Sequence, residues 1–398
     1  MAAIQRRKVF YIPGYDPMPP RRYRELYRTE GAAQAGISGY QLHLHAAAQG
    51  QRRFGWGATG QIQGQTTVAE FEVLHWADLV KASMTMGVIK TYGLMLRTAW
   101  VYIGSGALWR LVKLRKGPVI AALYPIVILL LQLLVGLLLA WGVYAMLAWV
   151  IGPWALGPAF AMLWAVLHGF KAVDGKVFAY YLMQDYAYSA QYWGENPPEL
   201  ERRMAEFTAS IRDALDQGYD EVLVVGHSSG AHLAVSILAD LCRGGGVPKG
   251  AKLGFLSLGH VIPMVGFLPR AWRLRADVQY LSGVDSITWV DVTAPGDGCT
   301  FALVDPAAVC GVAPDVQTGP LVISAAFSQT LSPAKWAALR RRYFRLHFQY
   351  LCAFDQPQGY DYFQITAGPV SLQARFAGRA ESPSCLRVPL SKYTTVAP

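Results

Sequence analysis

Charge is scarce in this sequence. Asp, Glu, Lys and Arg make up 16% of the 398 residues, whereas about 25% is typical of soluble domains. None of the four occurs between Lys116 and Lys171, and soluble helices rarely lack charge over so long a stretch. The pattern argues against an ordinary soluble domain and indicates a membrane-embedded segment.

Cysteine is also rare, and no CxxC or Cys/His metal spacing occurs. The odd number and the scatter of the cysteines predict reduced thiols, with no metal site and no cofactor. His43 and His45 alternate on one strand but have no carboxylate or cysteine partner at ligand spacing, so we expect them to be structural. The five cysteines are Cys242, Cys299, Cys310, Cys352 and Cys385.

The long apolar core of a signal peptide is not seen in the opening MAAIQRRKVFYIPGY, which places charge before a strand-like run, so we expect the main domain to stay in the cytoplasm. The formal net charge is +10, but no recognition helix, zinc motif or stacking motif accompanies the basic clusters, which argues against nucleic acid. Anionic lipid headgroups are the partner that we expect. The clusters lie at residues 6–8, 21–24, 110–116 and 340–345.

The uncharged stretch is long enough to cross a bilayer twice, since one crossing needs roughly 20 helical residues. We predict a helix over 126–148, a turn at Gly152-Pro153 and a returning helix over 154–170. Basic residues stand at both outer ends, so the positive-inside rule places both flanks in the cytoplasm. This predicts an integral membrane protein with two transmembrane helices, in a bacterial inner membrane, with its termini and catalytic domain cytoplasmic. The alternative is a buried hairpin in a soluble core.

Outside this hairpin, strands alternate with helices, which predicts an α/β fold with a mostly parallel sheet covered by helices on both faces. We expect three parts: 1–106, 107–171 with the hairpin, and 172–398. Between the strands 40–45 and 68–75 we expect only Gly-rich turns. The remaining predicted strands are 8–12, 221–225, 253–258, 287–292 and 362–366, and the predicted helices are 23–35, 198–217, 231–241 and 333–343.

One motif carries chemistry: Gly226-His227-Ser228-Ser229-Gly230 lies between the apolar strand EVLVV and the helix AHLAVSILADL. A nucleophile elbow needs a sharp strand-to-helix turn with small residues beside the serine, so that the strained backbone clears its neighbours. The sequence meets both requirements here.

On this motif and its context, the chain resembles the α/β-hydrolase superfamily, in particular its lipases and esterases. The resemblance covers roughly residues 8–16 and 198–370. It implies that Ser228 is the nucleophile and that the backbone N–H of Ser229 is one oxyanion-hole donor. The second donor would come from the loop after the first strand, at Tyr15 or Gly14, although this chain lacks the usual His-Gly pair there.

The same resemblance implies the order serine, acid, histidine along the chain. Of the downstream histidines, His232 lies on the elbow helix and His260 precedes the plausible acids, so His347 is the expected base. Asp297 is the expected acid, because it lies in a Gly/Pro turn beyond a strand's carboxyl end, where α/β sheets place their active sites. Asp291 and Asp305 are the reserve acids, and each acid is also explained as a turn or cap residue.

These expectations predict a membrane-anchored serine esterase or lipase that cleaves lipid or amphiphile esters through a Ser-His-Asp triad and an acyl-enzyme. An acyltransferase or thioesterase would use the same residues. A non-catalytic membrane scaffold on a hydrolase-like fold is a separate alternative, because fold does not dictate function. A transporter is disfavoured, since two uncharged helices offer no polar pathway.

Overall fold

A mixed β-sheet forms the centre of the computed structural model, which describes residues 3–48, 50, 53–84 and 87–398. Within these residues the sheet has eight strands in the order β2-β3-β4-β1-β5-β6-β7-β8. The strands from β4 to β8 are parallel, and β2 and β3 add an antiparallel edge. The bounds are β1 Arg6–Ile12, β2 Gln41–His45, β3 Gly55–Ile62, β4 Gln65–Val73, β5 Glu221–His227, β6 Leu253–Leu258, β7 Ile287–Thr293 and β8 Leu321–Ser324.

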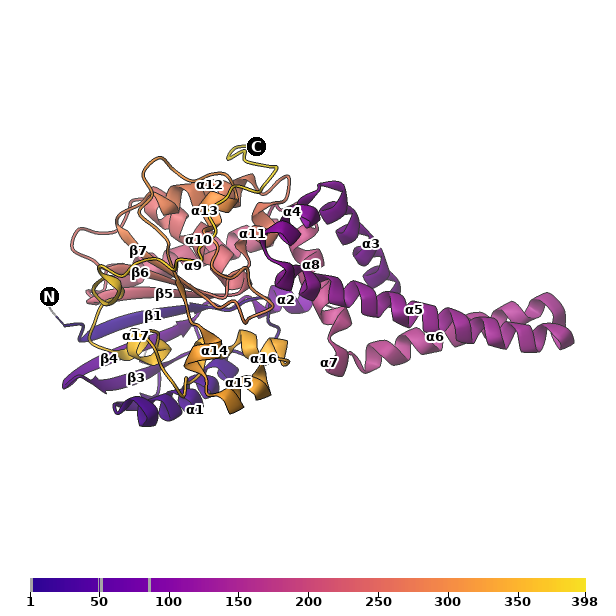
Figure 1. Cartoon of the computed structure of the whole chain (residues 1–398), viewed down its shortest axis with the longest axis horizontal. Helices are drawn as coiled ribbons and strands as arrows, with labels where there is room; N and C mark the ends of the chain where they lie inside the picture. The colour runs from indigo at the N-terminus through magenta and orange to yellow at the C-terminus, as the bar shows by residue number, and fades with distance from the viewer. Residues whose placement is uncertain (1–2, 49, 51–52, 85–86) are drawn as a thin grey trace.

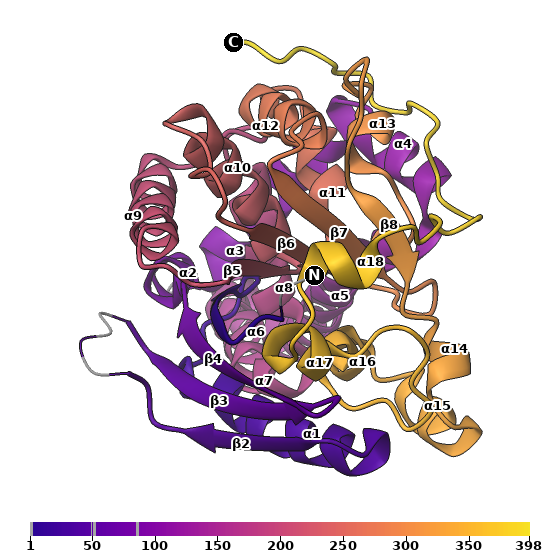
Figure 2. The ribbon, with the colours of Figure 1, turned by 90° about the vertical axis from the view of Figure 1, so that its left-hand side faces the viewer.

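Helices cover both faces of this sheet, which confirms the predicted α/β class (Figure 2). The side chains of β1 alternate between two hydrophobic cores: Phe10 and Ile12 pack into one, and Val9 and Tyr11 into the other. The first core lies under α9 (Pro198–Leu215), α10 (Ser229–Arg243) and α12 (Trp272–Ser282), and the second under α1 (Arg21–Ser38) and α17 (Tyr362–Ala367). Both faces of the central strands are buried, as their unbroken apolar sequences require.

Two sequence-based predictions at the sheet edges were wrong. The predicted strand over 362–366 is helix α17, whose first turn is capped by the Asp361 carboxylate. The Gly-rich segment predicted as turns contains β3. Glycine is needed there, because a Cβ on Gly57 would lie 1.9 Å from the His45 ring and one on Gly60 2.2 Å from the Ala367 carbonyl oxygen.

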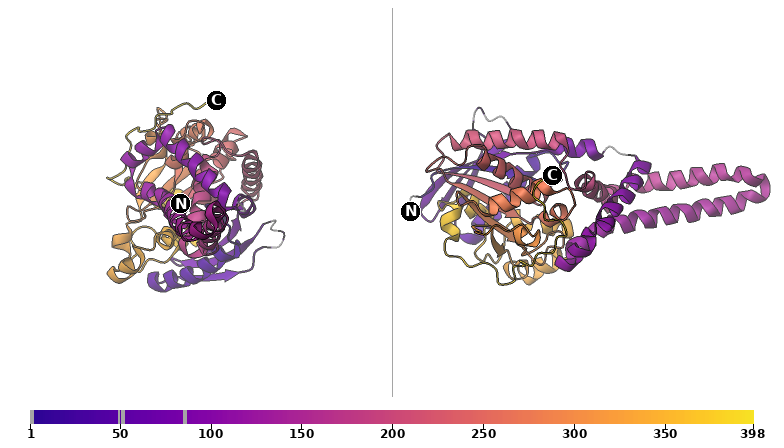
Figure 3. Two further views of the ribbon diagram at one scale, coloured as in Figure 1. Left: turned by 90° about the vertical axis from the view of Figure 1, so that its right-hand side faces the viewer. Right: turned by 90° about the horizontal axis from the view of Figure 1, so that it is seen from above.

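A long helical arm leaves the body of the molecule (Figures 1 and 3). It consists of α5 (Lys116–Ile151), the 3₁₀ turn η1 (Gly152–Ala155) and α6 (Leu156–Ala172). The two helices pack against each other, and a Cβ on Gly136 of α5 would lie 2.8 Å from Leu163 of α6. The whole stretch Lys116–Ala172 counts as one apolar membrane-span candidate, with mean hydropathy 2.7 and 22% of its most apolar window buried; it is the only one in the described chain.

The base of the arm is held by α3 (Val88–Gly104) and α8 (Ala179–Ala190), which form a third apolar cluster with it. Strands from 1–106 and strands from 172–398 belong to one sheet. The division of the chain into three parts stays a prediction. The remaining helices are α2 Ala77–Met84, α4 Ala107–Leu114, α7 Asp174–Val177, α11 Ile262–Gly266, α13 Pro306–Val309, α14 Phe327–Thr330, α15 Pro333–Leu339, α16 Tyr343–His347, the 3₁₀ turn η2 Gln349–Leu351 and α18 Leu372–Phe376.

Candidate active site

The carboxyl ends of three parallel strands bring most of the sequence-predicted residues to one edge of the sheet. Gly14 and Tyr15 follow β1, Ser228 follows β5, and Asp297 lies in the turn after β7. His347 is the last residue of α16. In open α/β sheets this edge is where ligands bind, because the loops that leave it diverge.

Ser228 occupies a strained bend between β5 and α10. Its backbone has φ 57° and ψ −125°, a region that a residue with a side chain visits only when the surroundings enforce it. The flanking glycines are required by contact: a Cβ on Gly226 would lie 2.7 Å from Ala231 Cα, and one on Gly230 would lie 2.1 Å from the Ile12 carbonyl oxygen. The bend therefore has the geometry of a nucleophile elbow, with its serine partly exposed.

The loop after β1 lies directly beside Ser228. A Cβ on Gly14 would be 3.0 Å from Ser228 Cβ and 3.4 Å from its Oγ. Two side chains fix this loop by its carbonyls, since Trp76 Nε1 donates to Pro13 O and Tyr181 Oη donates to Tyr15 O. Within the described residues, no hydrogen bond uses the backbone N–H of Gly14, Tyr15 or Ser229, so both predicted second donors remain candidates.

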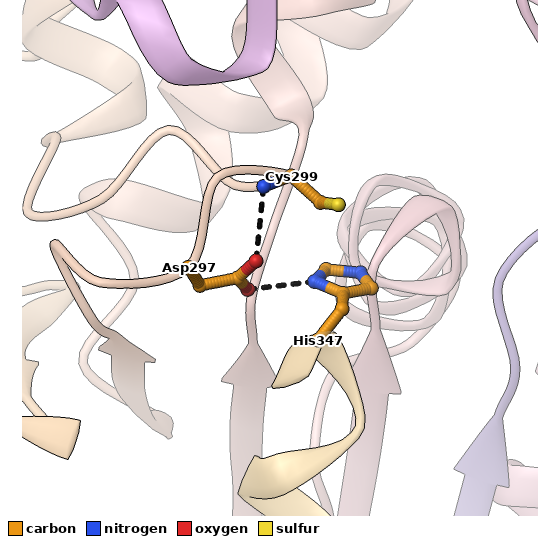
Figure 4. A group of neighbouring side chains, drawn as sticks. All are labelled: Asp297, Cys299 and His347. Atoms are coloured by element: carbon orange, nitrogen blue, oxygen red, sulfur yellow. Dashed lines mark hydrogen bonds and ion pairs between the residues drawn. The ribbon is translucent and has the colours of Figure 1, made fainter. Parts of the chain in front are cut away.

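Asp297 and His347 form a hydrogen-bonded pair, shown in Figure 4. His347 Nδ1 and Asp297 Oδ2 are 2.7 Å apart, and both side chains are buried. The other carboxylate oxygen accepts the backbone N–H of Cys299 at 2.9 Å. The carboxylate thus orients the imidazole with Nε2 on the far side of the ring, which is the arrangement that a general base requires.

His347 Nε2 is buried and has no hydrogen-bond partner within the described residues. The ring lies against the elbow: its centroid is 4.8 Å from that of His227, whose Nε2 is 2.9 Å from the His347 carbonyl oxygen. Burial, with the neighbouring His347, lowers the pKa of His227 to about 3. His227 therefore supports His347 as a neutral packing residue.

Tyr350 is a site residue that the sequence analysis missed. Its hydroxyl donates to Asp297 Oδ2 at 3.0 Å and accepts the backbone N–H of Ala294 at 3.0 Å. The phenol therefore ties Asp297 to the end of β7. Its position three residues after His347 was a possible signal, because residues at that spacing share one face of a helical turn.

The reserve acids and the other histidines have structural positions. Asp291 lies 3.6 Å from His260 Nε2, and both side chains have zero exposure. Asp305 caps α13 by accepting two backbone N–H groups. His232 is buried on the elbow helix, and burial lowers its pKa to about 4.

Asp297, Cys299 and His347 also form a group whose ligand atoms lie within 4.8 Å of one another, close enough to hold a metal ion (Figure 4). The chemistry of the donors fits a metal poorly. The hydrogen bond already uses the Nδ1 and Oδ2 atoms that would face the ion. Burial raises the pKa of the Cys299 thiol well above its usual value, whereas metal binding needs the thiolate.

Two pockets adjoin the site. An apolar pocket lies at the base of the arm, between α3, α4, α5 and α8; its empty space of about 510 Å³ includes volume open to solvent, and Tyr102, Leu111, Val119, Tyr186 and Met264 belong to its lining. A second pocket of about 360 Å³ includes Tyr15 and Ser229 of the predicted oxyanion hole. The pockets are neighbours, because Tyr186 and Met264 of the first adjoin Asp185 and Val265 of the second along the chain.

Both roots of the arm touch the segments that carry the catalytic pair. At the first root, Arg115 Nε donates to Ala302 O, and a Cβ on Gly117 would lie 3.4 Å from Gly298 Cα. At the second root, the Phe178 ring packs on Phe344 of α16, with 5.3 Å between their centroids. The arm and the site are therefore in direct contact.

Comparisons with protein-family models, with curated proteins and with solved structures found no match. The geometry of the site has to carry the functional argument.

Proposed function

We propose that this chain is a membrane-anchored serine hydrolase that cleaves carboxylic esters of lipids or other amphiphiles. The observation that supports the proposal is a strained serine at the end of β5, whose neighbour His227 packs on the imidazole of a His–Asp pair with an unpaired Nε2. The three sequence-predicted residues are far apart along the chain: 119 positions separate Ser228 from His347, and Asp297 lies between them. Their assembly at one sheet edge is hard to explain by packing alone.

In the proposed reaction, Ser228 Oγ attacks the ester carbonyl while His347 Nε2 takes its proton. The resulting oxyanion is stabilised by the Ser229 N–H and an N–H of Gly14 or Tyr15, each worth about 3 kcal/mol. His347 then returns the proton to the departing alcohol, which leaves an acyl-enzyme. Water attacks the acyl-enzyme by the same route, releasing the acid and restoring the Ser228 hydroxyl. Asp297 holds the imidazole and stabilises its charged form.

The membrane anchor is proposed from the surface of the arm. Large apolar side chains are exposed along it, and Trp149 and Trp154 near its tip are 93% and 83% exposed, which is costly in water. Basic residues gather at its root, where they would meet anionic headgroups. We infer two spans, α5 and α6, in a bacterial inner membrane, with the body and both termini cytoplasmic.

A lipid substrate is proposed from the apolar pocket. It lies at the base of the arm, where a hydrocarbon chain entering from the bilayer would find an apolar surface. An acyl chain buried there gains about 0.8 kcal/mol per methylene.

A fluorophosphonate probe applied to alkaline-washed membranes tests the proposal, because it reacts only with an activated serine. We expect labelling of the wild type in the washed membrane fraction, none of Ser228→Ala, and unchanged labelling of the exposed control Ser286→Ala. A folded wild type that is not labelled would favour a non-catalytic scaffold. If labelling succeeds, product analysis with water or an alcohol as acceptor separates hydrolysis from acyl transfer. Turnover of thioester substrates tests whether the chain is a thioesterase.

A further inference from the structure

The pocket beside the oxyanion hole has polar walls that the proposed mechanism leaves unused. Tyr15 and Ser229 form one side, and α8 supplies Asp185 and Tyr188 on another. His232 of the elbow helix and Glu195 complete the polar lining. A substrate carbonyl held between the two oxyanion donors therefore lies next to this pocket.

Several polar groups in the lining have no partner within the described residues. His232 is 8% exposed, and its Nδ1 has no hydrogen bond. Tyr188 Oη is likewise buried without a partner. No hydrogen bond or ion pair engages the Asp185 carboxylate in the described chain. Buried polar atoms are nearly always paired in native proteins, so the two buried unpaired atoms of this pocket, His232 Nδ1 and Tyr188 Oη, indicate that a ligand completes them.

The charge of the pocket is one-sided. Its lining contains the carboxyl groups of Asp185 and Glu195 but no lysine or arginine. Two arginines stand near it: Arg270 lies 3.6 Å from Glu195 and is 63% exposed, so solvent screens it, and Arg203 is paired with Asp78 at 2.7 Å. A phosphate placed here would face carboxylates without a lysine or arginine in the lining, and the helix N-terminus that lines the pocket, at Ser229, is used by the substrate carbonyl in the proposed reaction.

This local charge is opposite to that of the whole chain, whose net charge is +10. Basic residues at the arm root attract anionic lipids to the surface. Selection against an anionic headgroup would therefore have to arise in the pocket.

We infer that this pocket receives the alcohol part of the substrate ester, and that this alcohol is an uncharged polyol such as glycerol. The inference rests on the proposed function. Hydroxyl groups both donate and accept, so one polyol satisfies a histidine nitrogen, a phenol and a carboxyl group together. A quaternary ammonium would suit the carboxylates but would leave His232 and Tyr188 unpaired.

Asp185 fits this role in either protonation state. Burial raises its pKa to about 7, while the nearby His347 lowers it. The protonated carboxyl donates to a hydroxyl oxygen and the ionised one accepts from a hydroxyl group, whereas a phosphate would repel the ionised form.

The test compares esters that share one acyl chain and differ only in the alcohol. 1-Oleoylglycerol, 1-oleoyl-lysophosphatidic acid and oleoylcholine are diluted into vesicles of one fixed phospholipid composition, so that the surface potential stays constant. We expect kcat/KM for 1-oleoylglycerol to exceed that for the lysophosphatidic acid at least tenfold and to exceed that for oleoylcholine. Equal values, or a preference for either charged alcohol, would overturn the inference.

A variant of a pocket residue tests whether the pocket causes the preference for an uncharged alcohol. Asp185→Asn should raise the kcat/KM for lysophosphatidic acid relative to 1-oleoylglycerol several-fold, whereas the exposed control Asp285→Asn should not. Fluorophosphonate labelling shows that each variant keeps a working site. Labelling with no turnover of 1-oleoylglycerol overturns the polyol inference alone; absence of both labelling and turnover in a folded wild type overturns the hydrolase.

Discussion

Two His–Asp pairs lie at the same end of the sheet, and they differ in every property that catalysis needs. His347 Nδ1 and Asp297 Oδ2 are 2.7 Å apart, Asp297 lies in a turn and His347 at the end of α16, and one imidazole nitrogen is directed away from the acid. His260 and Asp291 are 3.6 Å apart, have zero exposure, and Asp291 lies within β7. In each pair a third residue donates a hydrogen bond to the carboxylate: the Tyr350 hydroxyl donates to Asp297 and the Ser257 hydroxyl donates to Asp291 at 2.6 Å.

The difference shows that residue types alone do not define a triad. Ser257, His260 and Asp291 have the composition of one, yet the Ser257 hydroxyl bonds the acid rather than a base and accepts the Trp289 indole N–H at 2.9 Å. The His260 side chain has zero exposure, whereas the His347 side chain keeps 9% of its surface exposed. We therefore expect His260 and Asp291, the inner pair, to determine stability. We expect His347 and Asp297, the outer pair, to determine activity.

Removal of the histidine should give the largest contrast. We expect His347→Ala to lower kcat by about 10⁴- to 10⁶-fold while the free energy of unfolding changes little. His260→Ala should do the reverse, because it leaves Asp291 buried without its partner, at a cost of about 3 kcal/mol. Ester hydrolysis and urea unfolding of both variants measure this. A His260→Ala protein that is stable but inactive would exchange the two assignments.

Neutralising the acids should give the next contrast. Asp297→Asn should lower kcat by about 10⁴-fold, because an amide cannot hold the imidazole in the required tautomer. Asp291→Asn should keep kcat. Burial raises the pKa of Asp291, so ionisation costs more in the folded state than in the unfolded state. Stability is therefore lost as pH rises above about 4, the ordinary carboxyl pKa, and the asparagine variant should lose less.

The smallest contrast in kcat should come from the hydrogen bonds around Tyr350 and Ser257, the residues that bind the two carboxylates. Tyr350→Phe removes a hydrogen bond to a charged carboxylate, worth about 1.5 to 3 kcal/mol, so kcat should fall about 10- to 100-fold. Trp289→Phe removes the indole N–H that Ser257 accepts and should leave kcat unchanged. Equal effects of the two variants on kcat would show that Tyr350 acts only through packing.

The sequence predicted the outer pair because its information is local and directional. A glycine-flanked serine between an apolar strand and a helix has few structural explanations, and a histidine far along the chain satisfied the order that the resemblance implied. The acid was harder to choose, since Asp291 lies inside the strand and Asp297 and Asp305 both follow it. Only the fold shows that Asp291 faces the core and that Asp305 caps a helix.

Other features depend on contacts between distant segments, which a single sequence does not reveal. Strand β3 was missed because its glycines resemble turn residues, although they serve close contacts with β2 and α17. The roles of Tyr350 and Asp185 were missed because both depend on segments that meet only in three dimensions. The predicted hairpin location agrees with α5 and α6. However, α5 begins at Lys116, ten residues earlier than the predicted start at 126.

The contact between Gly117 and Gly298 has a mechanical consequence. If the arm is embedded in lipid, its tilt changes with bilayer thickness and lateral pressure, and the body must accommodate that rotation at the arm's root. The root touches the loop residue that follows Asp297. A change in the physical state of the lipid would then act on the catalytic acid through a single layer of atoms, without any bound effector.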